Sequence, residues 1–154
     1  MILVKAPHYI IEHKGHKVLF LAGSIEMGSA ELWQDKVCEL LKDEKFLILN
    51  PRRDDWDSSW VQSKDNPQFR QQVEWELDGL AISDCIIFYF DKNTKSPITL
   101  LELGLCAWSR GRNCIVVCPD GFWRKGNVDI VCERYNVLQM ESLEKAIRYL
   151  LENF

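Results

Sequence analysis

Five short apolar runs, each followed by a segment with helical periodicity, set the main constraint on how this chain folds. Residues 85–90 read Cys-Ile-Ile-Phe-Tyr-Phe, and a run that is apolar on both faces is typical of a strand buried inside a parallel sheet. The other runs are residues 17–22, 46–50, 114–118 and 137–138. Parallel strands need a crossover between them, and the helical segments supply it each time. The alternation therefore predicts an α/β protein with a parallel sheet.

The helical segments cover about residues 29–41, 67–82, 97–108, 128–133 and 142–151. Strands and helices in this order predict a doubly wound, flavodoxin-like sheet of five parallel strands in the order 2-1-3-4-5. Residues 1–16, which include Tyr9 and Ile10, are interpreted as an additional N-terminal strand or hairpin. Because 154 residues without a repeat or linker suit one hydrophobic core, residues 1–154 are expected to form a single domain.

Composition excludes several classes of function. A net charge of −4 without a dominant basic patch argues against a nucleic-acid polymer as partner. The six cysteines form no CxxC pair and lie mostly in apolar segments, so they are interpreted as reduced core residues. No apolar stretch is long enough for a membrane span, and the first residues lack a signal-peptide pattern. We therefore expect a cytoplasmic protein with no bound metal.

The segment Ser96-Pro97-Ile98-Thr99-Leu100-Leu101-Glu102-Leu103-Gly104 follows the strand at residues 85–90. Ser96 suits the cap of a helix and Pro97 its first turn. The helix is apolar on nearly all sides and is expected to be mostly buried, with one carboxyl group, Glu102, inside it. A buried acid is costly unless it has a partner or a chemical task. Glu102 is therefore the first candidate for catalysis.

Two more loops leave the same expected edge of the sheet, where α/β proteins usually bind ligands. Gly23, Ser24 and Ile25 follow the first strand, where backbone N–H groups can face a ligand, although a simple tight turn explains them equally well. The second strand ends at Asn50 and leads into a loop rich in charged and aromatic residues. That loop is either a solvated charge run or a ligand-facing segment in which aromatic rings stack on a planar group. Its candidate residues are Arg52, Asp54, Asp55 and Trp56.

Helix 67–82 carries Phe69, Val73, Leu77 and Leu80, which are expected to face inward. The same helix carries three acids, and most acids on helices face solvent. They are Glu74, Glu76 and Asp78.

These motifs, in this order, resemble the nucleoside 2-deoxyribosyltransferases and their relatives, the deoxynucleoside-monophosphate N-glycosidases. The resemblance spans about residues 18–137. It is carried by Gly23-Ser24-Ile25, by Glu76-Leu77-Asp78-Gly79-Leu80 with Asp84, by Ser96 six residues before Glu102-Leu103-Gly104, and by Asn127.

The resemblance implies transfer of a 2-deoxyribosyl group between nucleobases, with deoxyribonucleosides and free nucleobases as partners and no cofactor. Glu102 would attack C1′ to form a glycosyl-enzyme, and a second base would then attack from the opposite face. An acid must protonate the departing base, and the candidates are Glu76, Asp54 and Asp55. The family supplies the residue matching Asn127 from a neighbouring subunit, which implies a homodimer or a larger homo-oligomer.

The chain departs from the family pattern at four positions. One is Glu76, which stands where the family usually has the shorter aspartate. Phe20 replaces a tyrosine that orients the nucleophile, so Tyr89 or a water molecule would have to take that role. Ser96 stands where typical transferases have an aspartate. The monophosphate hydrolases have a serine at this position. Glu26, however, replaces the arginine of those hydrolases, and its charge would repel a phosphate, which favours nucleosides over 5′-monophosphates.

Two alternatives stay open. One is an N-glycosidase that uses the same site with water as the acceptor. The other is a nucleotide-binding sensor module without turnover, because a fold alone does not establish catalysis.

Overall fold

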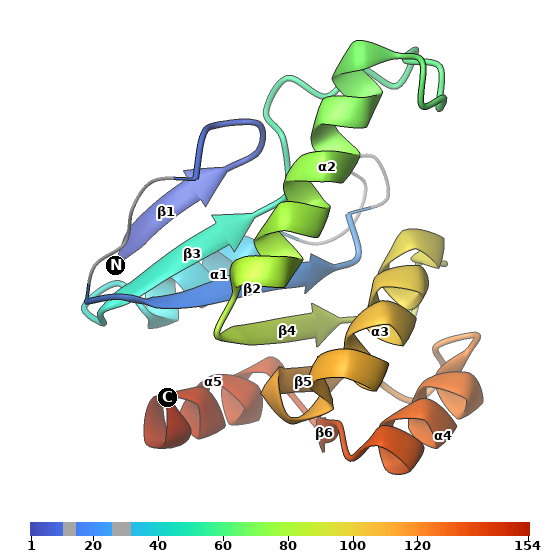
Figure 1. The fold of residues 1–154 in the computed structure, drawn as a ribbon. Helices are drawn as coiled ribbons and strands as arrows, with labels where there is room; N and C mark the ends of the chain where they lie inside the picture. The colour runs from blue at the N-terminus through green and yellow to red at the C-terminus, as the bar shows by residue number, and fades with distance from the viewer. Residues whose placement is uncertain (11–14, 26–31) are drawn as a thin grey trace.

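The computed structural model describes residues 1–10, 15–25 and 32–154 and contains a six-stranded parallel sheet (Figure 1). The order across the sheet is β1-β3-β2-β4-β5-β6. The strands are β1 (Ile2–Lys5), β2 (Lys17–Gly23), β3 (Phe46–Asn50), β4 (Cys85–Tyr89), β5 (Cys114–Val117) and β6 (Leu138–Met140). Without β1, the sheet has the predicted order 2-1-3-4-5, so the flavodoxin-like α/β fold is confirmed.

The additional N-terminal strand is present, but not at the apolar residues that suggested it. β1 pairs in parallel with β3, with Ile2 opposite Leu47. Tyr9 lies after this strand and is exposed, and Ile11 lies outside the described residues. The sheet therefore has six strands rather than five.

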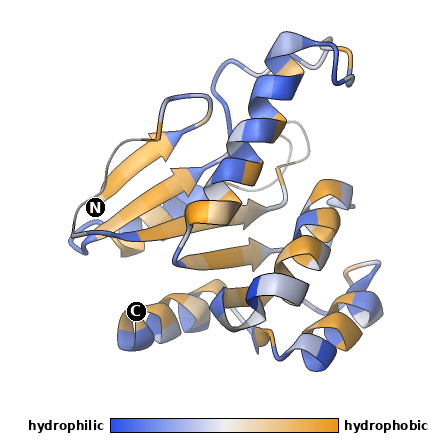
Figure 2. Ribbon diagram, viewed as in Figure 1, coloured by the Kyte–Doolittle hydropathy of each residue, from blue (hydrophilic) through white to orange (hydrophobic). Residues whose placement is uncertain are grey.

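Helices cover both faces of the sheet. They are α1 (Trp33–Leu40), α2 (Pro67–Ile82), α3 (Pro97–Arg110), α4 (Lys125–Tyr135) and α5 (Leu143–Asn153), with a short 3-10 turn at Gly111–Asn113. Side chains of α2, α3 and α4 join one core cluster, and those of α1 and α5 join the other (Figure 1). The central strands are therefore buried on both faces, which explains why they are apolar throughout (Figure 2). No helix of the described residues is long and apolar enough to cross a membrane.

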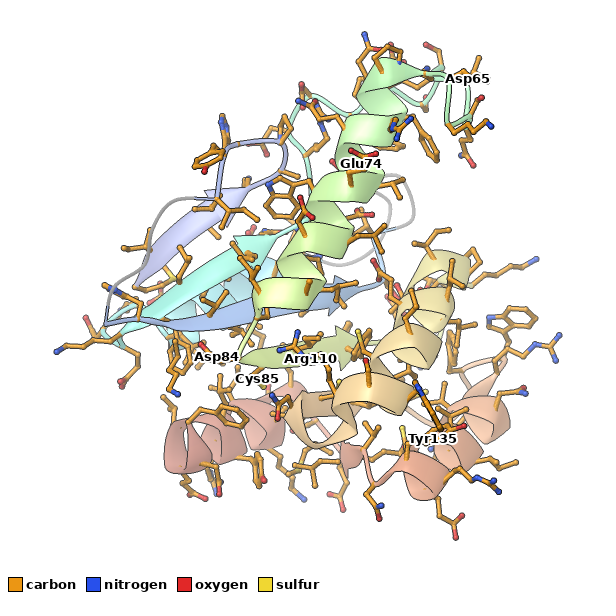
Figure 3. The ribbon with its side chains drawn as sticks, viewed as in Figure 1. Asp65, Glu74, Asp84, Cys85, Arg110 and Tyr135 are labelled. Carbon is orange, nitrogen blue, oxygen red and sulfur yellow. The ribbon has the colours of Figure 1, made fainter. Side chains whose placement is uncertain are left out.

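The end of α2 is fixed to the sheet by polar contacts (Figure 3). The Asp84 carboxylate accepts a hydrogen bond of 2.8 Å from the backbone N–H of Val18, at the start of β2. The Arg110 guanidinium, at the end of α3, donates to the backbone carbonyls of Leu80, Ala81 and Ser83. Because the last carbonyls of a helix lack partners within it, Arg110 satisfies them and joins α3 to α2.

The buried face of α2 differs from the expected one. Leu80 is buried as predicted, but Leu77 is exposed, and Phe69 and Val73 are only partly buried. The buried residues are Gln72, Trp75, Gly79 and Leu80. A Cβ at Gly79 would lie 2.6 Å from the Phe20 ring, so the glycine lets α2 approach β2 closely and selects this face.

We predict that Gly79→Ala destabilises the fold by about 1–3 kcal/mol, because the added methyl group overlaps the buried Phe20 ring. Gly126→Ala in α4 is the matched control, since a Cβ there meets no atom within 4 Å. That control should leave stability unchanged or raise it by about 0.5–1 kcal/mol. Urea unfolding of both variants measures the difference, and equal stabilities would contradict the close approach of α2.

Candidate active site

Glu102 lies in the second turn of α3, on the face that packs over the sheet. It is only 8% exposed, and burial is the main reason why its pKa is raised well above the usual range. Negative charge on the Glu76 carboxylate or on the Cys106 sulfur adds to this effect, and both disfavour the ionised form of Glu102. The structure thus confirms burial of this carboxyl group within an apolar helix.

Glu76 comes from α2, which lies beside α3 on the same face of the sheet (Figure 1). Burial raises its pKa to about 7, against a smaller opposite effect of a hydrogen bond from Gln72. The Gln72 side-chain amide donates to Glu76 Oε1 at 2.8 Å and to the backbone carbonyl of Pro51 at 2.9 Å. Gln72 therefore fixes the Glu76 carboxyl relative to the loop after β3.

The two carboxyl groups form an electrostatically coupled pair. Two buried carboxylates repel each other, so the pair retains a proton at neutral pH instead of carrying two charges. The amide of Gln72 stabilises the ionised form of Glu76, whereas burial and the neighbouring charges all disfavour the ionised form of Glu102. Two carboxyl groups that differ in how firmly they hold a proton are what a reaction with both a nucleophilic carboxylate and a proton donor requires.

Three hydroxyl groups connect the end of β2 to the start of α3. Ser24 Oγ lies 2.6 Å from Ser96 Oγ and 2.8 Å from Thr94 Oγ1, and the latter two are 2.9 Å apart. Ser24 Oγ also accepts a hydrogen bond of 3.0 Å from the backbone N–H of Asp91. The structure thus brings together the two motifs that the sequence separates by 72 residues.

Ser96 does not have the capping role expected of it. Its backbone is in the left-handed region, with φ of 46°, and its side chain makes no capping hydrogen bond. The hydroxyl is used in the cluster with Ser24 and Thr94, and the side chain is buried. Ser96 therefore sets where α3 begins, and with it the position of Glu102.

Gly23 is required by close packing at the end of β2. A Cβ there would lie 2.6 Å from both the Trp33 ring and the backbone carbonyl of Tyr89. The Trp33 ring stacks on Tyr89 at 4.9 Å, and its indole N–H donates to the Ser24 carbonyl at 3.1 Å. Ile25 is partly buried directly after this turn, and Glu26 lies outside the described residues.

Tyr89 is therefore a poor replacement for the missing family tyrosine. It packs in the core cluster that α1 and α5 cover, on the other face of the sheet from Glu102. Phe20 is fully buried on the Glu102 face and packs on Trp75 of α2. Of the two donors suggested for orienting Glu102, Tyr89 and a water molecule, the water molecule therefore remains the candidate.

The loop after β3 contains both buried and exposed candidates. Asn50 is fully buried, and its side-chain oxygen accepts a hydrogen bond of 2.9 Å from the Arg52 backbone. Burial lowers the pKa of Arg52, which is half-buried. Trp56 is also half-buried and contacts Trp60 edge-on, with ring centroids 5.2 Å apart.

Asp54 and Asp55 are exposed and engaged in ion pairs. Asp54 accepts from Lys5 Nζ at 2.7 Å, and Asp55 accepts from Arg53 Nε at 2.8 Å. The hydrogen bond from Arg53 is the main reason why the pKa of Asp55 is lowered. An acid with a lowered pKa is ionised at neutral pH and is a weak proton donor.

Asn127 lies in the first turns of α4, not in the loop predicted before that helix. It is exposed and lines a cavity of about 300 Å³ between α3 and α4, together with Leu100, Leu103 and Gly104. Glu102 does not line this cavity. Asn127 and Glu102 of one chain therefore lie on different sides of α3.

Sequence reasoning missed Gln72 and Thr94. Gln72 precedes Glu76 by four residues in one helix, a spacing that places two side chains on the same face, so this contact could have been expected. Thr94 carries no comparable signal, because its contact with Ser24 depends on the path of the loop. Among the described residues, no group of three or more His, Cys, Asp or Glu side chains could hold a metal ion.

Residues 16–122 match the family described as nucleoside 2-deoxyribosyltransferase like. The chain belongs to this family. The matched region covers most of the chain and includes Ser24, Glu76, Ser96 and Glu102, whereas Asn127 follows it. No curated protein matches the chain. Membership in the nucleoside 2-deoxyribosyltransferase-like family indicates an enzyme that transfers glycosyl groups.

We predict that Glu102→Gln makes stability less dependent on pH. Because the folded protein keeps the Glu102 proton well above pH 4.5, whereas the unfolded chain releases it near that value, the wild type loses stability as pH rises above 4.5. A glutamine has no proton to release. Urea unfolding should therefore show that the free energy of unfolding of the variant, relative to that of the wild type, is higher at pH 8 than at pH 5. The difference between the two pH values should exceed about 0.5 kcal/mol.

Glu74→Gln is the control for this measurement. Glu74 lies on α2, is exposed and pairs with Arg70 at 2.6 Å (Figure 3). Its replacement should change stability by a similar amount at both pH values. Parallel pH curves for the wild type and Glu102→Gln would contradict the raised pKa of Glu102.

Proposed function

We propose that this protein transfers a 2-deoxyribosyl group between nucleobases through a covalent bond to Glu102, with Glu76 carrying the proton. The observation that supports this most is the coupled pair of buried carboxyl groups on α2 and α3. A binding module would have no need of this pair, because burying both acids costs stability.

The first step is a proton transfer within the pair. Before substrate binds, Glu102 is neutral, and Glu76, whose pKa is about 7, is ionised in part of the molecules, a form that Gln72 stabilises. A sugar carbon that gains positive charge favours an ionised Glu102 beneath it. The proton then moves from Glu102 to Glu76, whose pKa of about 7 suits both taking and giving a proton at neutral pH.

Glycosyl transfer follows in two displacements. A carboxylate oxygen of Glu102 bonds to C1′ while the C1′–N bond breaks, and its electron pair leaves with the base. The proton on Glu76 moves to the nitrogen of the departing base. An incoming base then attacks C1′ from the opposite face, the bond to Glu102 breaks, and Glu76 takes up the proton that the incoming base releases. Two inversions leave the configuration at C1′ unchanged.

Glu76 suits the role of proton donor better than Asp54 or Asp55 does. Both aspartates are exposed and ion-paired, whereas Glu76 is coupled directly to Glu102. Its pKa of about 7 also lies near the range in which a general acid works best.

The remaining candidates are assigned to substrate binding and positioning. Trp56 offers an aromatic face for a nucleobase, near Arg52 and Asn50 at the end of β3. Ser24 and Ser96 hold the start of α3, and Gly23 and Ile25 form the adjoining turn. Asn127 is assigned to the active site of a neighbouring subunit, which agrees with its distance around α3 from its own Glu102.

The test is chromatography of the reaction with deoxyinosine, with and without excess adenine. Deoxyadenosine should form only when adenine is present. Glu102→Ala should lower the exchange rate at least about 1,000-fold, and Glu76→Gln should lower it about 100- to 10,000-fold. Glu74→Gln, on the exposed side of α2, should keep the wild-type rate.

Other outcomes distinguish the alternatives. Free hypoxanthine without a new nucleoside would identify an N-glycosidase that uses water as the acceptor. Binding of deoxynucleosides without any product, across nucleosides and their monophosphates, would identify a sensor module. Full activity of Glu102→Ala would contradict the proposed nucleophile.

A further inference from the structure

Two free thiols meet between α3 and the sheet. Cys106 lies in the second half of α3, and Cys114 is the first residue of β5. Both side chains are buried in the same core cluster, and the Cys114 thiol lies within hydrogen-bond reach of the Cys106 sulfur. Cys114 Sγ also lies 3.4 Å from the backbone carbonyl oxygen of Arg110, one turn after Cys106. The last turns of α3 therefore contact β5 through a pair of sulfur atoms.

The sheet topology selects Cys106 as the thiol that faces Cys114. β4 and β5 pair in parallel with Ile86 opposite Cys114, so Cys85 is one residue out of line. Cys85 belongs to the core cluster on the other face of the sheet, whereas Cys106 shares the cluster of Cys114. Cys118 is on the same face as Cys114, but it follows four residues later, which is roughly 13 Å along an extended chain.

The surroundings of Cys106 favour its thiolate form. The hydrogen bond from Cys114 is the main reason why the pKa of Cys106 is lowered; burial opposes this effect, and the charge of Arg110 adds to it (Figure 3). The thiolate is the form of cysteine that reacts with oxidants. Cys38 is the least buried of the six cysteines, but burial and the charge of Asp35 raise its pKa. Exposure and thiolate character therefore predict different cysteines as the first to react.

We propose that Cys106 and Cys114 form a reversible oxidation site, in which a hydroperoxide converts the two thiols into a disulfide that joins α3 to β5. The position of the two sulfur atoms on one face of the sheet carries this proposal, which does not depend on the proposed function.

The chemistry takes two steps when the oxidant is hydrogen peroxide. The Cys106 sulfur attacks one peroxide oxygen and the O–O bond breaks, which gives a sulfenic acid and a hydroxide ion that takes up the Cys106 proton. The Cys114 sulfur then bonds to the Cys106 sulfur, the S–O bond breaks, and the hydroxyl group leaves with the Cys114 proton as water. Two thiols lose two electrons and two protons, and one peroxide is reduced to two water molecules.

The first step also prepares the second. The hydrogen bond with Cys106 is the main reason why the pKa of Cys114 is raised, with burial and the charge of Cys106 as further causes. A sulfenic acid carries no negative charge, so its formation removes the charge that keeps Cys114 protonated. The order of reaction is therefore Cys106 first and Cys114 second.

The oxidation site lies next to the candidate nucleophile. Glu102 precedes Cys106 by four residues on α3, a spacing that places two side chains on the same face of a helix. After burial and the charge of Glu76, negative charge on the Cys106 sulfur is the third cause that raises the pKa of Glu102. A disulfide carries no charge. Oxidation is therefore expected to lower the pKa of Glu102 and to tie its helix to the sheet.

The test is peptide mapping by mass spectrometry after brief treatment of the folded full chain with hydrogen peroxide. The remaining thiols are alkylated in denaturant without a reductant. We expect one disulfide, between Cys106 and Cys114, with a mass loss of two hydrogen atoms, while Cys38 is still alkylated. Dithiothreitol should restore both thiols. Oxidation of Cys38 while Cys106 and Cys114 remain thiols would overturn the proposal.

Two alanine variants provide the controls. Cys132→Ala removes another buried thiol of the same core cluster, so Cys106 and Cys114 should pair at the wild-type rate. Cys114→Ala removes both the second thiol and the hydrogen bond to Cys106. In this variant dimedone should trap a sulfenic acid on Cys106, and its formation should be at least about fivefold slower. An unchanged rate would contradict the role given to Cys114.

The rate in the folded state distinguishes an oxidation site from thiols that react only after unfolding. Cys132 is buried and its pKa is raised to about 12, with burial as the main cause. In the folded protein, hydrogen peroxide should consume Cys106 at least about tenfold faster than Cys132. In concentrated urea the two rates should become similar, because the local surroundings are lost. Equal rates in the folded protein would overturn the proposal.

The effect on Glu102 is tested separately and rests on the proposed function. The pH profile of base exchange should move to lower pH in the oxidised protein, on the limb set by ionisation of Glu102, and dithiothreitol should reverse the shift. An unchanged profile in protein that carries the disulfide would overturn the effect on Glu102. Absence of exchange in the reduced protein would instead count against the proposed function.

Discussion

The coupling of two buried carboxyl groups is the constraint on which the rest of the site depends. Glu102 and Glu76 lie on separate helices, Glu102 is buried and Glu76 is half-buried, and the charge of Glu76 raises the pKa of Glu102. Burial of acids opposes folding, so the surrounding structure has to hold α2 and α3 firmly against the sheet. It does so through Gly79, which admits close packing, and through Arg110, which joins the ends of the two helices.

The geometry of α3 links the candidate site to the sheet. Its start is fixed by the hydroxyl groups of Ser24, Thr94 and Ser96, which join the end of β2 to the loop after β4. Its inner side carries Glu102, and its outer side carries exposed apolar side chains, although the sequence predicts a helix buried on nearly all sides. These are Ile98, Leu101, Leu105 and Trp108. A change at the start of α3 would therefore shift Glu102 relative to the sheet.

Several elements were predictable because their signals are local. Helix α2 begins after Asn66, whose side chain accepts from the N–H groups of Gln68 and Phe69 as an N-cap does, and Pro67 follows it. The strand at residues 46–50 is apolar up to its last residue, Asn50, and occurs as predicted. Other features depend on distant contacts. Ser96 has the residue type of a cap, yet its hydroxyl binds Ser24 instead, and the apolar sequence of α3 does not reveal which side remains open. The Gln72 contact with Glu76 could have been expected from their spacing of four residues.

The most direct test of the account is mass spectrometry of the protein after brief reaction with a deoxynucleoside and an acid quench. A bond between C1′ and Glu102 predicts a mass gain of one deoxyribosyl group, located on the peptide that contains Glu102 and lost when excess nucleobase is added before the quench. Labelling of Glu76 or another residue, or exchange without any labelled protein under conditions that trap the intermediate, would contradict the central claim that Glu102 is the nucleophile.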